Sequence, residues 1–278
     1  MSDVEYALRR TPEEYERLRA QARMWEAATG RLLDQARPGP GTRCLDAGCG
    51  PGETMRLMAM RVGPATTVTG IEVDAALAIT AERSLHADGH RQCRVLVHDL
   101  SSHEPIPGGP YDLVLARLLL LHVPDRVAVL RRLWESVAEG GHLLVQDYDM
   151  AGVGALPSLA SAEEVARVLL ETFTAVGCDV RTGMALPTLL AEAGIGAPDG
   201  TDVAGRLEPL GTAARMLEQT FRSLLPAALA HGVTDAAGAE RTLAALARDA
   251  ARHPARPVHW PLMIGAWKRR DHLGGGSR

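Results

Sequence analysis

Acidic residues and glycines that follow a short apolar run form the most informative chemical pattern in the sequence. In the segment 44–55, CLDAGCGPGETM, Asp46 is followed by three glycines at alternate positions, Gly48, Gly50 and Gly52. Glycines let a backbone approach a ligand closely, and the start of a helix offers unpaired N–H groups. The segment therefore predicts a strand, a glycine turn and a helix that together form a cradle for a nucleotide-type ligand.

Three details of this turn argue against a dinucleotide. The dinucleotide pattern needs Gly or Ala at the position that Glu53 occupies. Pro51 has no backbone N–H to give to a phosphate. Asp46 and Glu53 place acidic groups on either side of the turn, which suits a cation better than a pyrophosphate. An ordinary glycine-rich turn without a ligand stays the alternative interpretation.

The pattern Asp-x-Gly-x-Gly-x-Gly after a strand resembles motif I of class I S-adenosylmethionine (SAM)-dependent methyltransferases. SAM carries an ammonium and a sulfonium and no phosphate, which agrees with the acidic turn. The resemblance implies that the three glycines shape a SAM cradle and that Asp46 lies near the methionine amino group.

Acidic residues after the next two predicted strands extend the resemblance. Glu72 lies at the C-terminal end of the apolar segment VTGIEV, just before Val73. A carboxylate can accept two O–H bonds, and strand ends form the ligand crevice of such folds, so Glu72 suits a ribose diol. The resemblance assigns the ribose to Glu72, with Val73 beside it, and the adenine to Asp99 and the backbone of Leu100. A Glu72 that is merely buried, capping or exposed is the alternative.

The segment 110–116, PYDLVLA, matches motif IV of the same family. Arg117 follows at the predicted crevice edge, and we count it among the cofactor-binding residues. Methyltransferases that act on the nitrogens of nucleic-acid bases resemble one another in a [DNS]-P-P-[YFW] run, where this chain has Ala-Arg-Leu-Leu. The net charge is −4 and we find no basic stripe, which also disfavours a nucleic-acid substrate.

The segment 11–36 is predicted to form one amphipathic helix, with Thr11 as its cap and Pro12 in its first turn. Its phrase EEYERLRAQ resembles the N-terminal helix of a subgroup of small-molecule methyltransferases, which packs over the SAM pocket. The resemblance places Tyr15 and Gln21 near the methionine end of SAM. A solvated charged face is the alternative for either residue.

Four polar side chains are candidates for a general base on the acceptor side of the site: His122, Asp147, Tyr148 and His259. Methyl transfer from a sulfonium mainly requires that the reacting atoms are held in line, and a base is needed only if the acceptor must lose a proton. The sequence does not rank these four residues. Strand capping, solvation or a structural role is the alternative for each of them.

Alternating apolar strands and helices predict an α/β fold with a doubly wound parallel sheet. The resemblance specifies a class I methyltransferase (Rossmann-like) fold, whose seven-stranded sheet is mostly parallel with strand 7 antiparallel, plus a helical lid. We predict strands at 42–45, 66–73, 94–97, 110–116, 142–146, 203–210 and 258–268. After the N-terminal helix, we predict helices at 53–62, 75–87, 127–139, 162–176, 186–193, 212–230 and 236–252.

The predicted elements divide the chain into four parts. These are an N-terminal helical cap (1–37), a SAM-binding core (38–150), the remainder of the core with a helical substrate lid (151–270), and a flexible tail (271–278). Four cysteines without a C-x-x-C pair indicate reduced thiols in a cytoplasmic protein without a metal. The longest apolar run is interrupted by Arg117 and is too short to span a membrane.

We therefore expect a SAM-dependent methyltransferase that acts on an O, N or C atom of a small molecule, with S-adenosylhomocysteine as product. The overall resemblance is to bacterial enzymes of secondary metabolism. No nucleic-acid or membrane partner is expected, and the protein is a monomer or a homodimer. Two alternatives stay open: a SAM-binding enzyme that catalyses a cyclisation or decarboxylation, and a non-catalytic SAM-binding protein.

Overall fold

A seven-stranded sheet forms the centre of the computed structural model, which describes residues 11–102 and 104–272. Its strand order is β3-β2-β1-β4-β5-β10-β7, with β10 antiparallel to both of its neighbours. The strands are β1 (Cys44–Ala47), β2 (Val68–Glu72), β3 (Cys93–Val97), β4 (Tyr111–Arg117), β5 (Val137–Asp149), β7 (Gly200–Ala204) and β10 (Leu262–Arg269). The predicted fold class is confirmed, while residues 1–10 and most of the predicted tail lie outside the described residues.

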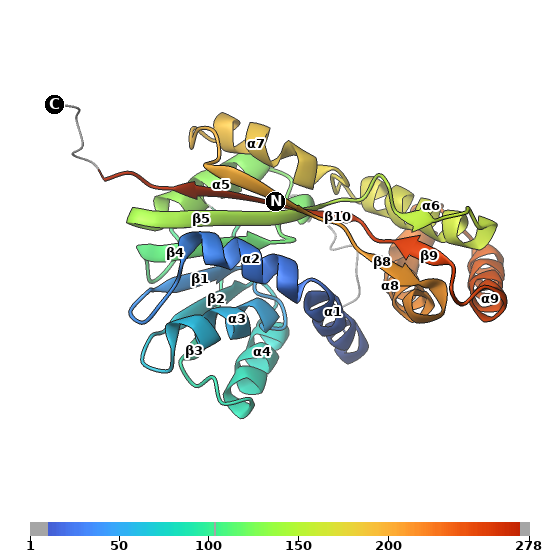
Figure 1. Cartoon of the computed structure of the whole chain (residues 1–278), viewed down its shortest axis with the longest axis horizontal. Helices are drawn as coiled ribbons and strands as arrows, with labels where there is room; N and C mark the ends of the chain where they lie inside the picture. Colours follow the sequence, from blue (N-terminus) through green and yellow to red (C-terminus); the bar gives the residue numbers. More distant parts are fainter. Residues whose placement is uncertain (1–10, 103, 273–278) are drawn as a thin grey trace.

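Helices cover both faces of this sheet (Figure 1). One face carries α2 (Glu26–Ala36), α3 (Glu53–Val62) and α4 (Ala75–Ala87), and the other carries α5 (Arg126–Glu135) and α7 (Thr182–Glu192). Alternate residues of a strand point to opposite faces, so β4 places Leu113 and Leu115 in one apolar cluster and Val114 and Ala116 in the other. Burial on both faces explains the nearly continuous apolar sequence of this strand.

The predicted N-terminal helix is two helices, because the chain turns at Trp25. Thr11 caps α1 (Pro12–Met24) as predicted, with its side chain accepting a hydrogen bond from the Glu14 N–H. Trp25 is buried and lies between the two helices. The axis therefore bends there: α2 follows the sheet, while α1 leaves it and packs against α3 and α8 (Leu210–Ala230) (Figure 1).

Strands 6 and 7 were predicted as continuous, and each is divided in the structure. The predicted strand 203–210 comprises the end of β7 and β8 (Leu207–Pro209), and the predicted strand 258–268 comprises β9 (Pro257–His259) and β10. Pro261 interrupts the second strand, because proline has no N–H for the ladder. β8 and β9 instead form a small sheet with β6 (Gly154–Ala155), in the order β6-β9-β8.

Three helices complete the end of the molecule that lies beyond α1 (Figure 1). The helices α6 (Ala160–Ala175), α8 and α9 (Ala236–Arg252) pack on one another and on the small sheet. Their apolar cluster also includes Trp25, Leu121 and Tyr148, so it continues to the end of β5. None of the helices within 11–102 and 104–272 combines the length and the apolar character needed to cross a bilayer.

Candidate functional site

The glycine turn after β1 has the backbone that its sequence requires. Gly48, Gly50 and Gly52 have φ values of 72°, 52° and 88°, in the left-handed region that favours glycine. A Cβ on Gly48 or Gly52 would meet the side chain of Leu119 or Leu85 at 3.0 or 2.8 Å, whereas a Cβ on Gly50 would meet no atom within 4 Å. A larger side chain at Gly50 would therefore extend into the space beside the turn.

Glu72 lies at the end of β2 and is joined to this turn. One carboxylate oxygen accepts a hydrogen bond from the Gly50 N–H at 3.1 Å, and the other accepts one from the Asp74 N–H at 3.0 Å. Burial raises the pKa of Glu72, and the two N–H groups oppose that effect. We call Asp46, the three glycines and Glu72 the cradle. Its backbone and carboxylates form one connected structure at the carboxyl ends of β1 and β2.

The remaining predicted adenosine contacts lie beside the cradle. Val73 follows Glu72 and is exposed, and Asp99 and Leu100 follow β3, the strand next to β2. Asp99 accepts a hydrogen bond from the Ser101 N–H at 2.7 Å, and Leu100 is buried. The structure thus brings the carboxylates predicted for ribose and adenine to adjacent strand ends, as strand order in a doubly wound sheet requires.

Asp46 and Arg117 are neighbours across β1 and β4, whose register pairs Ala47 with Ala116. Asp46 is 1% exposed, and burial raises its pKa to about 7 although the Arg117 charge opposes this. Within the described ranges, Asp46 Oδ2 and Arg117 Nε and Nη2 are buried and have no hydrogen-bond partner. Such atoms are rare in folded proteins and call for an explanation. One unpaired acceptor and two unpaired donors therefore lie at the ends of two neighbouring strands, β1 and β4.

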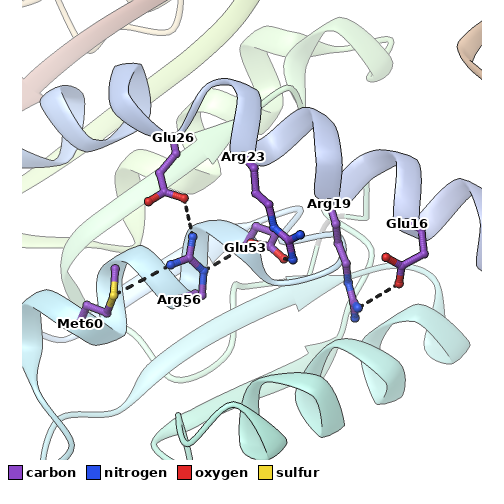
Figure 2. Close-up of polar contacts among 7 residues, drawn as sticks. All are labelled: Glu16, Arg19, Arg23, Glu26, Glu53, Arg56 and Met60. Carbon is purple, nitrogen blue, oxygen red and sulfur yellow. Dashed lines mark hydrogen bonds and ion pairs between the residues drawn. The ribbon is translucent and has the colours of Figure 1, made fainter. Parts of the chain in front are cut away.

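Ion pairs attach α1 and α2 to the start of α3 (Figure 2). Glu53, the first residue of α3, contacts Arg23 at 3.5 Å and Arg56 at 3.4 Å, and Arg56 also contacts Glu26 at 2.6 Å. Figure 2 shows Arg23 extending from α1 to Glu53, whereas Arg19 turns to Glu16 of its own helix. The acidic group of Glu53, which the sequence placed beside the ligand, is thus engaged by two arginines.

A second set of contacts joins α1 to the end of β5 and involves residues that the sequence reasoning missed. Arg17 donates two hydrogen bonds to Glu14 at 2.8 and 2.6 Å, and both residues are 4% exposed. Arg17 also donates to Gln21 Oε1 at 2.8 Å, and Gln21 Nε2 donates to the Tyr148 hydroxyl at 2.9 Å. On the cradle side, Tyr15 donates to Asp74 at 3.1 Å. The spacing of Glu14 and Arg17 by three residues was the available signal, but nothing marked the pair as buried.

Three of the four candidate bases lie close together at the ends of β4 and β5. Asp147 is fully buried, and its oxygens accept hydrogen bonds from the N–H groups of Leu121 and Tyr148. Burial raises the pKa of Asp147 to about 7 and lowers the pKa of His122 to about 4. We call Gln21, His122, Asp147, Tyr148 and Cys178 the acceptor side. Each of them has a hydrogen bond to another part of the chain.

His259, the fourth candidate base, lies in the small sheet and not at an end of the main one. It lies in β9, where it is paired with Gly154 of β6 on one side and with Leu207 of β8 on the other. The neighbouring Trp260 is buried and donates its indole N–H to Glu208 at 2.9 Å. The division of the predicted strand 7 into β9 and β10 explains this placement, since the sequence suggested one strand that starts beside the crevice.

A cavity and the cysteines are the other features that could have a function. A cavity of about 490 Å³ is formed by the loop before β4, the end of α5 and Arg270. It lies at the amino ends of β4 and β5, whereas the cradle lies at the carboxyl ends of the strands. The four cysteines are free and buried. In the part of the chain that the structure describes, no cluster of three or more His, Cys, Asp or Glu side chains could hold a metal ion.

Comparison with known sequences agrees with the glycine motif. A family model described as "Methyltransferase domain" matches residues 44–141. Methyltransferase GfsG of Streptomyces halstedii is 28% identical over 216 residues, which are 75% of this chain and 71% of that protein. Trans-aconitate 2-methyltransferase of Rhizobium etli is 34% identical over 124 residues, which are 45% of this chain and 44% of that enzyme. The chain thus matches less than half the length of the second relative.

Comparison with solved structures agrees with the fold. A protein of Bacillus halodurans C-125 described as a methyltransferase has a TM-score of 0.61 at 13% identity, covering 88% of this chain and 100% of that one. Phosphoethanolamine N-methyltransferase 2 of Haemonchus contortus, solved with phosphomonomethylethanolamine and S-adenosylhomocysteine, has a TM-score of 0.53 at 16% identity, covering 88% and 53%. The chain thus contains a segment, residues 44–141, that matches the methyltransferase domain, and it has the Rossmann-like fold of class I methyltransferases.

Proposed function

We propose that this protein binds SAM in the cradle and transfers its methyl group to an O, N or C atom of a small-molecule acceptor. The observation that carries the proposal is the group of unpaired buried atoms on Asp46 and Arg117. The described residues leave one carboxylate oxygen without a donor and two guanidinium nitrogens without an acceptor at this place. A ligand that offers both an ammonium and a carboxylate would satisfy all three atoms.

The methionine end of SAM is such a ligand. Its ammonium would donate to Asp46, and its carboxylate would accept from Arg117, whose fork of N–H donors suits a carboxylate. The Asp46 carboxylate would also favour a cationic ligand over a neutral one in this buried setting. This pairing explains why the chain retains a buried acid and an incompletely paired arginine, which both lower the stability of a folded protein.

The cradle also suits the nucleoside end. Glu72 would hold the ribose, Asp99 and Leu100 the adenine, and Val73 would lie beside them, since all four residues follow adjacent strands. Glu72 already accepts two backbone N–H groups, which fix its orientation before a ligand arrives. A carboxylate oxygen has a second lone pair for a ribose hydroxyl. Because Gly50 has no side chain, the ligand could lie directly against its backbone.

SAM, when bound, supplies an electrophilic methyl group on a sulfonium. The chain's own contribution is to orient the reactants and to exclude water. Tyr15 and Gln21 join α1 to Asp74 and Tyr148 at the ends of the strands, and α1 packs against α8, which in turn packs on α6 and α9. We propose that α1 and these helices form the cap and the lid of the acceptor site.

The acceptor class rests on the relatives and on the charge of the chain. The names of two relatives state small acceptors, trans-aconitate and demethylmenaquinone. The net charge of −4 does not favour a nucleic acid. We therefore propose a small molecule of bacterial secondary metabolism as acceptor, and a cytoplasmic monomer or homodimer as the working form.

Titration calorimetry with SAM tests the binding half of the proposal. We expect wild-type protein to bind SAM, and Arg117→Met to lose roughly tenfold or more in affinity, because hydrogen bonds to a charged group contribute about 1.5–3 kcal/mol each. Arg43→Met, which changes an exposed arginine paired with Asp112, is the matched control and should bind normally. Equal affinity in both variants would remove Arg117 from the site.

A screen of candidate acceptors tests the catalytic half. A product that is heavier by one methyl group, formed in step with S-adenosylhomocysteine, supports methyl transfer. Conversion of an acceptor without S-adenosylhomocysteine would instead indicate a SAM-binding enzyme of another reaction class, and SAM binding with no conversion across the screen would favour a binding protein.

A further inference from the structure

Three polar side chains at the ends of adjacent strands lie on one face of the main sheet. Asp46 is paired with Leu115 across β1 and β4, and Arg117 lies two residues further along β4. Arg117 is paired with Gln146 across β4 and β5, and Tyr148 lies two residues further along β5. Since alternate residues of a strand share a face, Asp46, Arg117 and Tyr148 form a row that leads from the cradle to the acceptor side.

Trp25 lies at the Tyr148 end of this row. The centres of the two rings are 5.9 Å apart, and the rings meet edge to face. Trp25 is 3% exposed, and its indole N–H is buried without a hydrogen-bond partner among the described residues. An indole nitrogen can donate a hydrogen bond but cannot accept one. The proposed SAM contacts leave this buried donor unused.

A chain of hydrogen bonds from α1 directs the hydrogen of the Tyr148 hydroxyl. A guanidinium group only donates, so the amide atom of Gln21 that faces Arg17 at 2.8 Å must be the oxygen. The other amide atom, Nε2, then donates to the Tyr148 hydroxyl at 2.9 Å. Because the hydroxyl oxygen accepts from Gln21, its own hydrogen must go to a different acceptor.

Among the described residues, the carboxylate closest in sequence is not placed to be that acceptor. Asp147 precedes Tyr148, so its side chain points to the opposite face of β5. There it accepts the backbone N–H of Leu121, in the short helix η1 (Leu120–His122), at 3.1 Å, and that of Tyr148 at 2.9 Å. The Tyr148 hydrogen therefore points away from this acid.

The side chains that act on the Tyr148 hydroxyl are donors. Burial raises the pKa of Tyr148, and four groups oppose this effect: Gln21, Arg117, Arg17 and the Trp25 N–H. The phenol stays protonated at neutral pH, so it is a donor as well. A buried group of donors requires an atom with free lone pairs, and the two guanidinium charges favour an atom that is negative.

We propose that the Tyr148 hydroxyl and the Trp25 N–H, which we call the donor pair, bind an anionic oxygen of the acceptor, such as a carboxylate, enolate or phenolate. Two donors on one oxygen stabilise negative charge there. Arg117 is not part of the pair, because its unpaired Nε and Nη2 suit the two oxygens of the SAM carboxylate. This role rests on the proposed function, and it selects an anionic acceptor over a cationic amine. It also makes Tyr148 a hydrogen-bond donor and not a base.

Nuclear magnetic resonance of the indole N–H groups tests the donor pair in the complex with S-adenosylhomocysteine. The chain has four tryptophans, and Trp25→Phe identifies the Trp25 signal by its loss. Formate, acetate and benzoate are the probes, because each carries one carboxylate. We expect them to move the Trp25 N–H proton downfield as the hydrogen bond forms. Trp260 is the internal control and should not move, since its N–H already donates to Glu208.

The same titration on variants measures the part of the hydroxyl. Tyr148→Phe should bind benzoate roughly tenfold or more weakly, because it removes a hydrogen bond to a charged group. Tyr111→Phe is the matched control and should bind benzoate normally. Tyr111 is also buried, but its hydroxyl donates to the Pro107 carbonyl near the amino end of β4.

A second variant covers the case in which Tyr148→Phe folds poorly. In Gln21→Glu, one carboxylate oxygen would still accept from Arg17, and the other would accept the Tyr148 hydrogen. Benzoate affinity should then fall although the hydroxyl is still present. Unchanged affinity in Gln21→Glu would contradict the assigned direction of that hydrogen.

Three further results would overturn the proposal. They are a Trp25 signal that none of the three probes moves, equal benzoate affinity in wild-type protein and Tyr148→Phe, and a shift caused by S-adenosylhomocysteine alone that the probes do not extend. The last result would assign the donor pair to the SAM carboxylate. Calorimetry with S-adenosylhomocysteine separates the two proposals: if it does not bind, the proposed function fails, and the probe titration on the free protein decides the donor pair by itself.

Discussion

The cradle and the acceptor side differ in how their polar atoms are satisfied. On the acceptor side, side chains use their hydrogen bonds on one another and on the backbone, as in the contacts of Gln21 with Tyr148 and of Asp147 with η1. In the cradle, Asp46 and its neighbour Arg117 retain buried atoms without a partner among the described residues. The difference supports the proposal that the cradle binds a charged ligand, whereas the side chains of the acceptor side are held by hydrogen bonds within the chain.

The largest effect should come from closing the cradle with a side chain. Gly50→Val would put a branched side chain into the space beside the turn, at a φ of 52°. We expect SAM affinity to fall by at least 100-fold in calorimetry, because the side chain would occupy the ligand's place.

Gly89→Val is the matched control for this prediction. Gly89 also has a positive φ, of 92°, and a Cβ there meets nothing within 4 Å, but it follows α4 and lies away from the cradle. Both variants carry the same kind of backbone strain, and only Gly50→Val should lose binding. Equal loss in both would show that strain, and not the blocked space, is responsible.

The next effect concerns pH. An ammonium binds the ionised form of Asp46, whose pKa burial raises to about 7. SAM affinity should therefore rise with pH up to about 7 and level off above it, changing by up to about tenfold per unit below this value. Asp46→Asn should bind SAM at least about 30-fold more weakly at pH 8 and show a flatter pH profile, because a buried charged hydrogen bond contributes roughly 2–5 kcal/mol. A wild-type affinity that is constant from pH 5 to pH 8 would count against this role.

A smaller effect, on stability, should differ between the two regions. The raised pKa of Asp46 means that between about pH 4 and 7 the folded state binds a proton that the unfolded state does not, so this residue lowers stability as pH rises through that window. Asp46→Asn should therefore raise the free energy of unfolding at pH 8 by about 1–3 kcal/mol.

Asp147→Asn provides the contrast. Burial raises the pKa of Asp147 to about 7 as well, so removal of its charge gives a similar gain at pH 8. Its amide NH₂, however, would face a backbone N–H that now has an acceptor, so the free energy of unfolding of Asp147→Asn should lie below that of Asp46→Asn by about 1–3 kcal/mol. Denaturant unfolding of both variants at pH 8 measures the difference. Destabilisation by both substitutions would mean that Asp46 has a structural role like that of Asp147.

The smallest effect is expected at the ion pairs that join α1 to α3. Arg23→Gln removes a contact of 3.5 Å to Glu53, and the arginine side chain is 64% exposed. Exposed pairs contribute less than about 1 kcal/mol. Stability and SAM affinity should change little, and the change should vanish at high salt. A large loss of SAM affinity would show that this pair holds α1 in place over the cradle.

The sequence predicted the strand, glycine turn and helix of the cradle well because the signals of these elements are local. The helices α3, α4 and α9 have the predicted bounds, and the cofactor candidates Asp46, Glu72 and Asp99 come from strand ends that the topology brings together. A strand, a glycine turn and a helix cap are each determined by neighbouring residues.

The contacts of the acceptor side were not predicted, because they join residues that are far apart in the chain. The meeting of His122 with Cys178, 56 residues apart, leaves no periodic signal. The turn at Trp25 lies inside a continuous amphipathic pattern, so the sequence shows no sign of it. The change of direction goes with the packing of α1 against α8, which is a contact between distant parts of the chain. Pro261 was an available signal for the break between β9 and β10, which places His259 in the small sheet.

A crystal structure of the protein with S-adenosylhomocysteine tests the central claim most directly. The account predicts the amino group within hydrogen-bond distance of Asp46 Oδ2, the carboxylate against Arg117, and the ribose at Glu72. A nucleoside bound elsewhere, or an amino-acid end that leaves Asp46 and Arg117 without contacts, would contradict it.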